Sequence, residues 1–210
     1  MARPIAKDHD AKRTAILKKA AGYFADHGYD RASVSQVARA CGISKSLIYH
    51  YYDSKEQLLF DIIHSHLAQV HDAVATVSNH GADPKVHLRH LVAELLMAYR
   101  GADAEHRLQL QGTTALSLHQ QQDLATIQRA IVSIFADAIL TIAPGYLNDQ
   151  PTYLRPLTMS LFGMLNWFYL WYQPGRGLTR SAYADMATEI LLGGLERLQK
   201  HEGAENPTLT

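Results

Sequence analysis

Apolar residues recur at helical spacing along almost the whole chain, and no segment alternates as a strand would. A first stripe covers about residues 9–27 and ends before Gly28. Two short helical patterns follow, split by a three-residue turn that contains Gly42, with Ser33 and Ser44 in N-cap positions. Their periodic apolar residues are Val34, Val37, Ala38 and Cys41, then Leu47 and Ile48. Since helices this short are marginal alone, we expect them to pack on the first helix as a helix-turn-helix.

The remaining pattern predicts one long helix after another. The expected ranges are 54–78, 84–100, 103–119, 124–143, 157–172 and 180–200, with a turn at 120–122 and a cap at Thr179. Residues 157–172 are apolar on almost every side, so this helix should be covered both by its own body and by a second copy. We therefore expect an all-α fold of about nine helices. Residues 1–55 should form a three-helix DNA-binding domain and residues 56–210 a helical ligand-binding and dimerisation domain.

The second short helix carries hydrogen-bonding side chains on its outer face, close to its N-terminus. A helix of this kind fits the major groove of duplex DNA, where side chains reach base edges and phosphates. Lys55, at the start of the next helix, is placed to clamp a phosphate. The expected DNA-binding residues are Ser33, Ser35, Lys45, Ser46, Tyr49, His50, Tyr51 and Lys55. The alternative is that Gly42 only joins two helices and that the tyrosines form a packing seam.

Charge is divided unevenly along a chain that is neutral overall. Residues 1–55 contain ten Lys or Arg and five Asp or Glu, a net charge of +5; the whole chain has 20 of each, so the remainder carries −5. A basic N-terminal segment attracts phosphate. Arg3, Lys7, Lys12 and Arg13 are interpreted either as an arm that extends this basic segment or as a solvated flank.

Longer runs of the sequence resemble a known family. The run G-I-S-K-S-L-I-Y-H-Y-Y-D-S-K-E-Q-L-L at 42–59 resembles the DNA-binding signature of the TetR/AcrR family of bacterial transcription regulators, and residues 16–38 look like that family's first helix and its approach to the second. A weaker similarity, L-F-G-M-L-N-W-F-Y-L-W-Y-Q-P-G followed by L-L-G-G-L-E-R-L, is to the C-terminal halves of TetR-type regulators of lipid, acyl-CoA and aromatic-acid catabolism.

The resemblance implies a homodimer that binds a palindromic double-stranded DNA operator and is released by a small effector in the body. The effector would be hydrophobic, such as an acyl-CoA or an aromatic acid. The expected ligand-binding residues are Val70, Leu91, Leu95, Leu110, Ile131, Phe135, Phe162, Asn166 and Trp167. The expected dimer interface is a four-helix arrangement with Leu161, Leu165, Tyr169, Leu191, Gly194, Leu195 and Leu198. The favoured function is a ligand-responsive repressor.

Twelve histidines raise the alternative of an all-helical metal-dependent hydrolase or metal sensor. The candidates are His64, His66, His71, His87 and His90, but no His-Glu-x-x-His pattern occurs. Nucleophile-elbow, phosphate-loop and dinucleotide fingerprints are also missing. We therefore expect surface histidines, no enzyme, no cofactor and no metal site, and we interpret the lone Cys41 as a small core residue rather than a redox sensor.

The sequence contains no run of about 18 apolar residues and no secretory-signal pattern at its N-terminus. We therefore expect a soluble cytoplasmic protein with no membrane partner.

Overall fold

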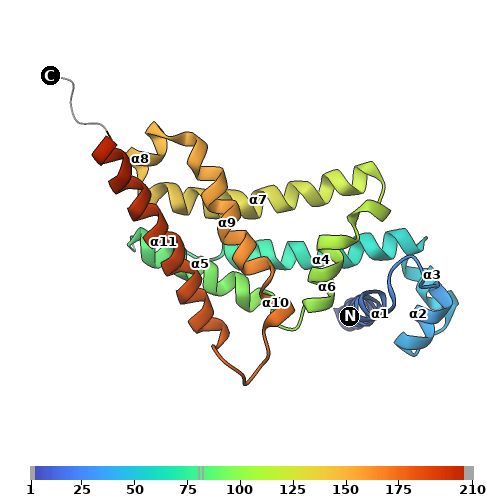
Figure 1. The fold of residues 1–210 in the computed structure, drawn as a ribbon. Coiled ribbons are helices and arrows are strands. Elements are labelled where there is room, and N and C mark those ends of the chain that lie inside the picture. Colours follow the sequence, from blue (N-terminus) through green and yellow to red (C-terminus); the bar gives the residue numbers. More distant parts are fainter. Residues whose placement is uncertain (1–2, 80, 82, 206–210) are drawn as a thin grey trace. The chain divides into compact units, whose positions relative to one another are not determined.

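The computed structural model describes the backbone of residues 3–79, 81 and 83–205, and the side chains of residues 11–79, 81 and 83–201. This part of the chain is helical, with no strand and one isolated bridge between Gln173 and Arg176. Its elements are α1 (Arg3–His27), α2 (Val34–Cys41), α3 (Lys45–Tyr51), α4 (Lys55–Ala75), α5 (Pro84–Ala98), α6 (Asp103–Gln111), η1 (Thr113–Ala115), α7 (Leu118–Ile142), α8 (Pro144–Asp149), η2 (Pro151–Tyr153), α9 (Leu154–Asn166), α10 (Phe168–Trp171) and α11 (Arg180–Glu205) (Figure 1). The expected all-α fold is confirmed.

The helices form two compact units. The head unit contains residues Met1–Gln69 and Gly101–Gln128, and the body unit contains Val70–Arg100 and Arg129–Thr210. The expected boundary at 55/56 differs from this division, because the first part of α4 and all of α6 pack with the helix-turn-helix. A segment distant in sequence therefore completes the core of the head unit.

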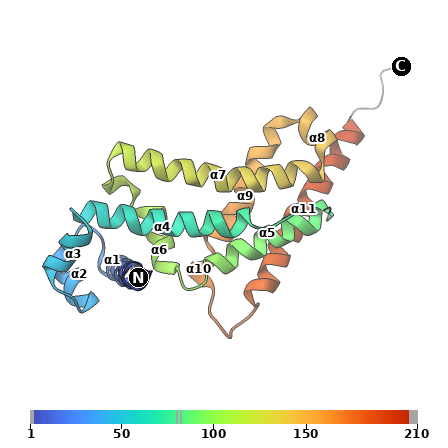
Figure 2. The ribbon, with the colours of Figure 1, turned by 180° about the vertical axis from the view of Figure 1, so that it is seen from behind.

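In the head unit α1 packs against α2 and α6, and α2 packs against α3. Both views of the ribbon show α1 beside α6 (Figure 1, Figure 2). The guanidinium group of Arg107 on α6 donates a hydrogen bond to the carbonyl oxygen of Ala25 near the end of α1. The shared core contains the buried side chains of Ile16, Ala20, Phe24, Val37, Ile48, Leu58 and Ile62. The short helices α2, α3 and α6 thus gain the packing surface that they lack alone.

In the body unit α11 packs along α5 and α9, and α10 follows α9 (Figure 2). The core contains Leu88, Leu91, Leu95, Phe135, Ile139, Leu161, Leu165, Leu191 and Leu195, each with 5% or less of its surface exposed. The hydroxyl of Thr179 accepts a hydrogen bond from the backbone N–H of Ala182, so the expected cap of the last helix is confirmed.

The expected turn at 120–122 is wrong. These glutamines lie inside α7, which begins at Leu118. The side chain of Ser117 accepts a hydrogen bond from the backbone N–H of Gln120 at 3.3 Å, and the Gln120 side chain accepts one from the N–H of Ser117 at 3.1 Å. This reciprocal pair is a capping box, so the polar run starts a helix rather than interrupting one.

The continuous apolar helix expected at 157–172 is also wrong, because it breaks at Trp167 between α9 and α10. Trp167, Leu170 and Trp171 are 60%, 55% and 54% exposed. The segment is therefore not covered on all sides within one chain.

One helix in the described part of the chain, α7, is long and apolar enough to cross a membrane by length and composition alone, with a mean hydropathy of 1.5. Its faces differ, however. The buried side includes Leu124, Ile131, Phe135 and Ile139, and the exposed side includes Thr126, Arg129, Ser133 and Asp137. A charged outer face is typical of an amphipathic core helix.

Candidate nucleic-acid interface

The turn between α2 and α3 has the geometry of a helix-turn-helix. Gly42 has φ +72°, its N–H donates to the carbonyl of Arg39 at 3.0 Å, and the N–H of Ile43 donates to the carbonyl of Ala38 at 3.0 Å. This pair of bonds is a Schellman motif, which requires a residue in the left-handed region after the helix. Glycine adopts that region without steric cost, so Gly42 fixes the direction in which α3 leaves α2.

The start of α3 is capped by Ser44, as expected. The Ser44 hydroxyl accepts a hydrogen bond from the backbone N–H of Leu47 at 3.1 Å. It also lies 3.0 Å from the hydroxyl of Ser46. On the inner side of α3, Ile48 is buried in the head unit with 1% exposure. The cap and this buried residue fix which face of α3 meets solvent.

The outer face of α3 carries the four side chains expected to meet DNA bases and phosphates. Lys45, Ser46, Tyr49 and His50 are all exposed, and Tyr49 is 45% exposed. The Lys45 ammonium lies 5.5 Å from the centre of the Tyr49 ring. The ring of His50 meets that of Tyr51 edge to face at 5.4 Å. This surface combines donors, acceptors and a cation in the way that major-groove recognition uses them.

The N-terminus of α2 carries the expected serine hydroxyls. Ser33 forms a capping box with Gln36, in which the Ser33 N–H donates to the Gln36 side chain at 2.8 Å and the Ser33 hydroxyl accepts from the Gln36 N–H at 3.3 Å. Ser33 and Ser35 are both exposed. The Ser33 hydroxyl therefore positions the helix, whereas Ser35 is available at the surface.

The side chain of Lys55 bonds the protein's own backbone. Its half-buried ammonium donates to the carbonyl oxygens of Tyr29 at 2.9 Å and Ala32 at 3.1 Å. It also lies 4.1 Å from the centre of the Tyr29 ring. Lys55 thus ties the α1–α2 connection to the start of α4, and the phosphate contact expected of its third N–H stays a prediction. The sequence could not show these two bonds, since the acceptors lie more than twenty residues away.

The expected basic arm is only partly described. Arg13 is paired with Asp61 on α4, so it is held against the head unit rather than extended. Burial raises the pKa of the nearby Tyr52, which is 1% exposed, to about 12. Lys12 is exposed, and the side chains of Arg3 and Lys7 lie outside the described residues.

The residues expected to bind a ligand differ in burial. Val70, Leu91, Leu95, Ile131, Phe135 and Phe162 are buried, with Phe135 and Phe162 in edge-to-face contact at 5.0 Å. Half-buried Asn166 accepts a hydrogen bond from the hydroxyl of Tyr99 at 3.0 Å. Leu110 and Trp167 are 42% and 60% exposed, so the expectation that they face the body interior is wrong.

The residues expected at a dimer interface mostly face inward. Leu161, Leu165, Leu191 and Leu195 are buried in the core of their own chain, which leaves them unavailable to a second copy. Tyr169 and Leu198 are half-buried, and Gly194 is exposed. Helical periodicity identified the helices, but each has two apolar faces, and the sequence does not say which one its own chain covers.

Two of the histidines that the structure describes are buried, contrary to the expectation of surface histidines. His66 on α4 and His106 on α6 are 3% and 1% exposed, and their rings meet edge to face at 5.8 Å within the head unit. Burial and the neighbouring His106 lower the pKa of His66 to about 3. Within the described residues, no three histidine, cysteine or carboxylate side chains gather so that they could hold a metal ion. The metal-dependent alternative therefore has no support in this part of the chain.

Comparison with known proteins agrees with this geometry. Residues 16–62 match the family model of bacterial regulatory proteins of the tetR family, and residues 81–195 match the tetracyclin repressor-like C-terminal domain. The HTH-type transcriptional repressor KstR2 of Rhodococcus jostii (strain RHA1) is 26% identical over 221 residues, which cover 93% of this chain and 98% of the relative.

Solved structures share the fold. A TetR-family transcriptional regulator from Bordetella parapertussis 12822 has a TM-score of 0.80 and 32% identity, covering 86% of this chain and 93% of that one. AibR, solved in complex with isovaleryl coenzyme A and operator DNA, has a TM-score of 0.72 and 26% identity, covering 85% of this chain and 97% of AibR. The matched families consist of regulators rather than enzymes. With a helix-turn-helix head, a helical C-terminal domain and family matches to both, the chain belongs to the TetR family of DNA-binding transcriptional regulators.

Proposed function

We propose that this regulator is a dimeric repressor that reads a palindromic operator through α3 and leaves it when a small apolar, acyl-CoA-like effector binds the body unit. The observation that carries the proposal is the outer face of α3, where Lys45, Tyr49 and His50 face solvent while Ile48 fixes the helix from within. Residues 1–55, which include α3, carry a net charge of +5. A regulator that reads chromosomal DNA acts where the chromosome is, so a cytoplasmic location is part of the proposal.

Selection of duplexes from a random pool tests the DNA-reading part. We expect an inverted repeat whose half-sites lie about 10 base pairs or a multiple apart. Tyr49→Ala and Lys45→Ala should each weaken binding by about 1–3 kcal/mol, or roughly 5- to 150-fold. Lys85→Ala, an exposed lysine of the body unit, is the matched control and should bind as wild type does. Recovery of no common sequence, or equal binding by all variants, would contradict the proposal.

The exposed faces of α9 and α11 support a revised dimer surface. Met159 and Gly163 on α9, and Ile190, Gly193 and Gly194 on α11, are exposed. A Cβ atom added at any of these glycines would meet nothing of the chain within 4 Å, so the backbone is open to a close neighbour. Met186 and Ile190 are 41% and 55% exposed. We infer that two copies pack through these faces about a twofold axis. In such a dimer the same surface of each copy meets its counterpart.

The dimer surface is tested by Ile190→Glu, which introduces a charge at its centre. We expect the variant to elute as a monomer in multi-angle light scattering at micromolar concentration and to lose operator binding. Leu118→Glu is the control, because Leu118 is 77% exposed on α7 and lies outside the proposed surface. A dimeric Ile190→Glu variant would place the interface elsewhere.

The effector part of the proposal depends on the polar pair among apolar residues of the body unit. Tyr99 is 7% exposed, and its hydroxyl bonds Asn166 on α9 close to the buried Phe162. A site that is mostly apolar with a few polar groups is typical of small-molecule binding. The similarity to AibR, whose solved complex contains isovaleryl coenzyme A, directs the choice of probe to short acyl-CoA thioesters.

Release of the selected operator by a series of acyl-CoA thioesters tests this assignment. We expect Asn166→Leu to raise the concentration needed for release at least tenfold, with unchanged DNA binding in the absence of the thioester. Leu110→Ala, at an exposed position, is the control and should respond as wild type does. If no thioester releases the operator, the effector class is wrong even though the DNA-binding proposal stands.

A further inference from the structure

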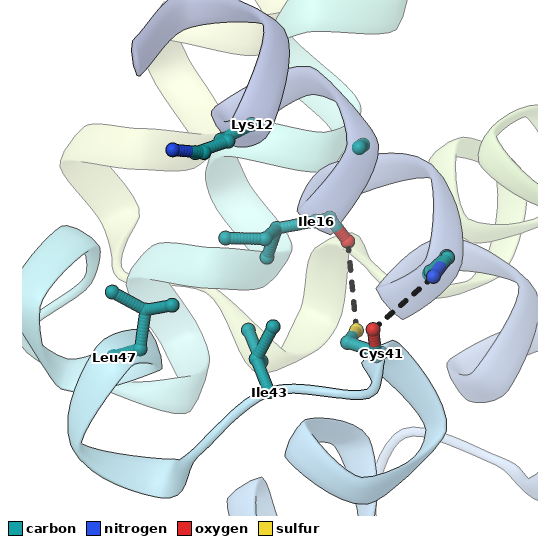
Figure 3. A pocket seen from close by; sticks show the side chains of 7 residues that line it. Lys12, Ile16, Cys41, Ile43 and Leu47 are labelled. Carbon is teal, nitrogen blue, oxygen red and sulfur yellow. Dashed lines mark hydrogen bonds between the residues drawn. The ribbon is translucent and has the colours of Figure 1, made fainter. Parts of the chain in front are cut away.

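The head unit contains a cavity of about 240 Å³ beside α3. It is bounded by α1, the end of α2, the turn after α2 and the first half of α3. Its apolar walls are Ala15, Ile16, Ile43 and Leu47, and Cys41 lies at its inner end. Figure 3 shows Ile43 and Leu47 extending toward Ile16 from the opposite side of this space. Ile16 and Cys41 are each 5% exposed, so the cavity reaches the core of the head unit.

The rim of the cavity is cationic. Lys12 and Lys19 on α1 complete the lining, and none of the seven lining residues is acidic. The Lys19 ammonium donates to the carbonyl oxygen of Cys41 at 3.1 Å, which holds its charge at the cavity. An ammonium group has three N–H donors, and this carbonyl takes one of them.

Apolar walls beneath a cationic rim select a ligand with an apolar body and an anionic end. An apolar cavity of roughly 150 Å³ is large enough for benzene. The larger cavity here therefore has room for a single ring or for a short to medium acyl chain. We propose that this cavity binds a medium-chain fatty carboxylate. Its hydrocarbon chain would lie between Ile16, Ile43 and Leu47, and its carboxylate would lie at Lys12 and Lys19.

The position of the cavity gives such a ligand a direct effect on DNA binding. Leu47 belongs to α3 and Ile43 to the turn that orients it. A ligand that binds free protein more tightly than DNA-bound protein weakens DNA binding by the same factor, because the coupling is reciprocal. The head would then be a second control point, separate from the effector site proposed for the body.

The test uses the full-length protein with ¹³C-labelled isoleucine and leucine methyl groups, titrated with octanoate. We expect saturable shifts of the Ile16, Ile43 and Leu47 methyl signals. Affinity should rise about fourfold for each methylene from butanoate to octanoate, since each buried CH₂ adds a fixed increment. Octanamide, which has the same chain but no charge, should bind at least tenfold more weakly.

Variants on α1 separate this site from others. Ala15→Phe fills the cavity and should abolish the saturable shifts, whereas Ala11→Phe, one turn away and exposed, should retain them. Lys19→Met should weaken octanoate binding while Lys18→Met, which lies outside the lining, should not. Unchanged far-UV circular dichroism shows that each variant is folded.

Several outcomes would overturn the proposal. These are shifts that do not saturate, shifts confined to methyl groups of the body unit, and unchanged affinity in Ala15→Phe. Because these measurements contain no DNA, they give an answer even if the proposed repressor function fails.

Discussion

Replacing His66 by glutamine should remove about 2 kcal/mol of the stability that the protein loses between about pH 7.5 and about pH 5. His66 is 3% exposed and packs against His106, and its pKa is lowered from 6.5 to about 3, first by burial and then by that neighbour. A histidine whose pKa is lower in the folded state costs no stability above pH 6.5, where both states are neutral. As the pH falls through 6.5 the unfolded chain takes up a proton that the folded chain excludes until about pH 3, so stability declines across that window.

The size of the effect follows from the two pKa values. At about pH 5 the unfolded state gains RT ln(1 + 10^1.5), or about 2 kcal/mol, whereas at about pH 7.5 the gain is close to zero. Wild type should therefore lose about 2 kcal/mol of unfolding free energy from this residue alone. Glutamine keeps a polar side chain but cannot titrate, so the variant should lose about 2 kcal/mol less than wild type over the same range.

Urea unfolding at about pH 7.5 and about pH 5, at one fixed protein concentration, measures this difference. Far-UV circular dichroism is the appropriate signal, because both tryptophans lie in the body unit and would report that unit alone. His201→Gln, an exposed position on α11, controls for the loss of a titrating group and should behave as wild type does. Equal pH sensitivity of His66→Gln and wild type would refute the conclusion that His66 is buried and neutral.

Three further substitutions test the head unit by urea unfolding at neutral pH. Lys55→Met should destabilise it by about 2–4 kcal/mol, because two carbonyl oxygens lose a charged donor; a value near zero would show that these bonds do not hold the α1–α2 connection. Gly42→Ala should cost about 1–2 kcal/mol, because alanine is strained at φ +72°, and an unchanged midpoint would contradict the left-handed turn. Ser33→Ala should cost about 1 kcal/mol through loss of the cap, whereas Ser35→Ala, at an exposed position inside α2, should cost little.

Much of the local structure of the proposed DNA-reading surface was predictable because it is encoded locally. The caps at Ser33 and Ser44 and the turn at Gly42 depend on side chains and backbone within four residues. The alternation of the buried Ile48 with the exposed Tyr49 and His50 follows from the helical repeat alone. These features needed no knowledge of the rest of the fold.

What the sequence missed in the head unit has one physical origin. The sequence did not show the structural role of Lys55, because its acceptors, the carbonyls of Tyr29 and Ala32, come from a distant connection. His66 was assigned to the surface because only the packing of α6 against the head unit buries it beside His106. In both cases a polar side chain looked exposed until a segment remote in sequence covered it.

By itself, the sequence determined the all-α class, the helix-turn-helix and the position of the recognition helix, because helical periodicity and capping act over a few residues. Only the tertiary structure decided which apolar face of α9 and α11 the chain covers itself, since Leu161 and Leu191 are as apolar as the exposed Met159 and Ile190. Burial depends on what packs against a face, and that is a property of contacts between distant segments.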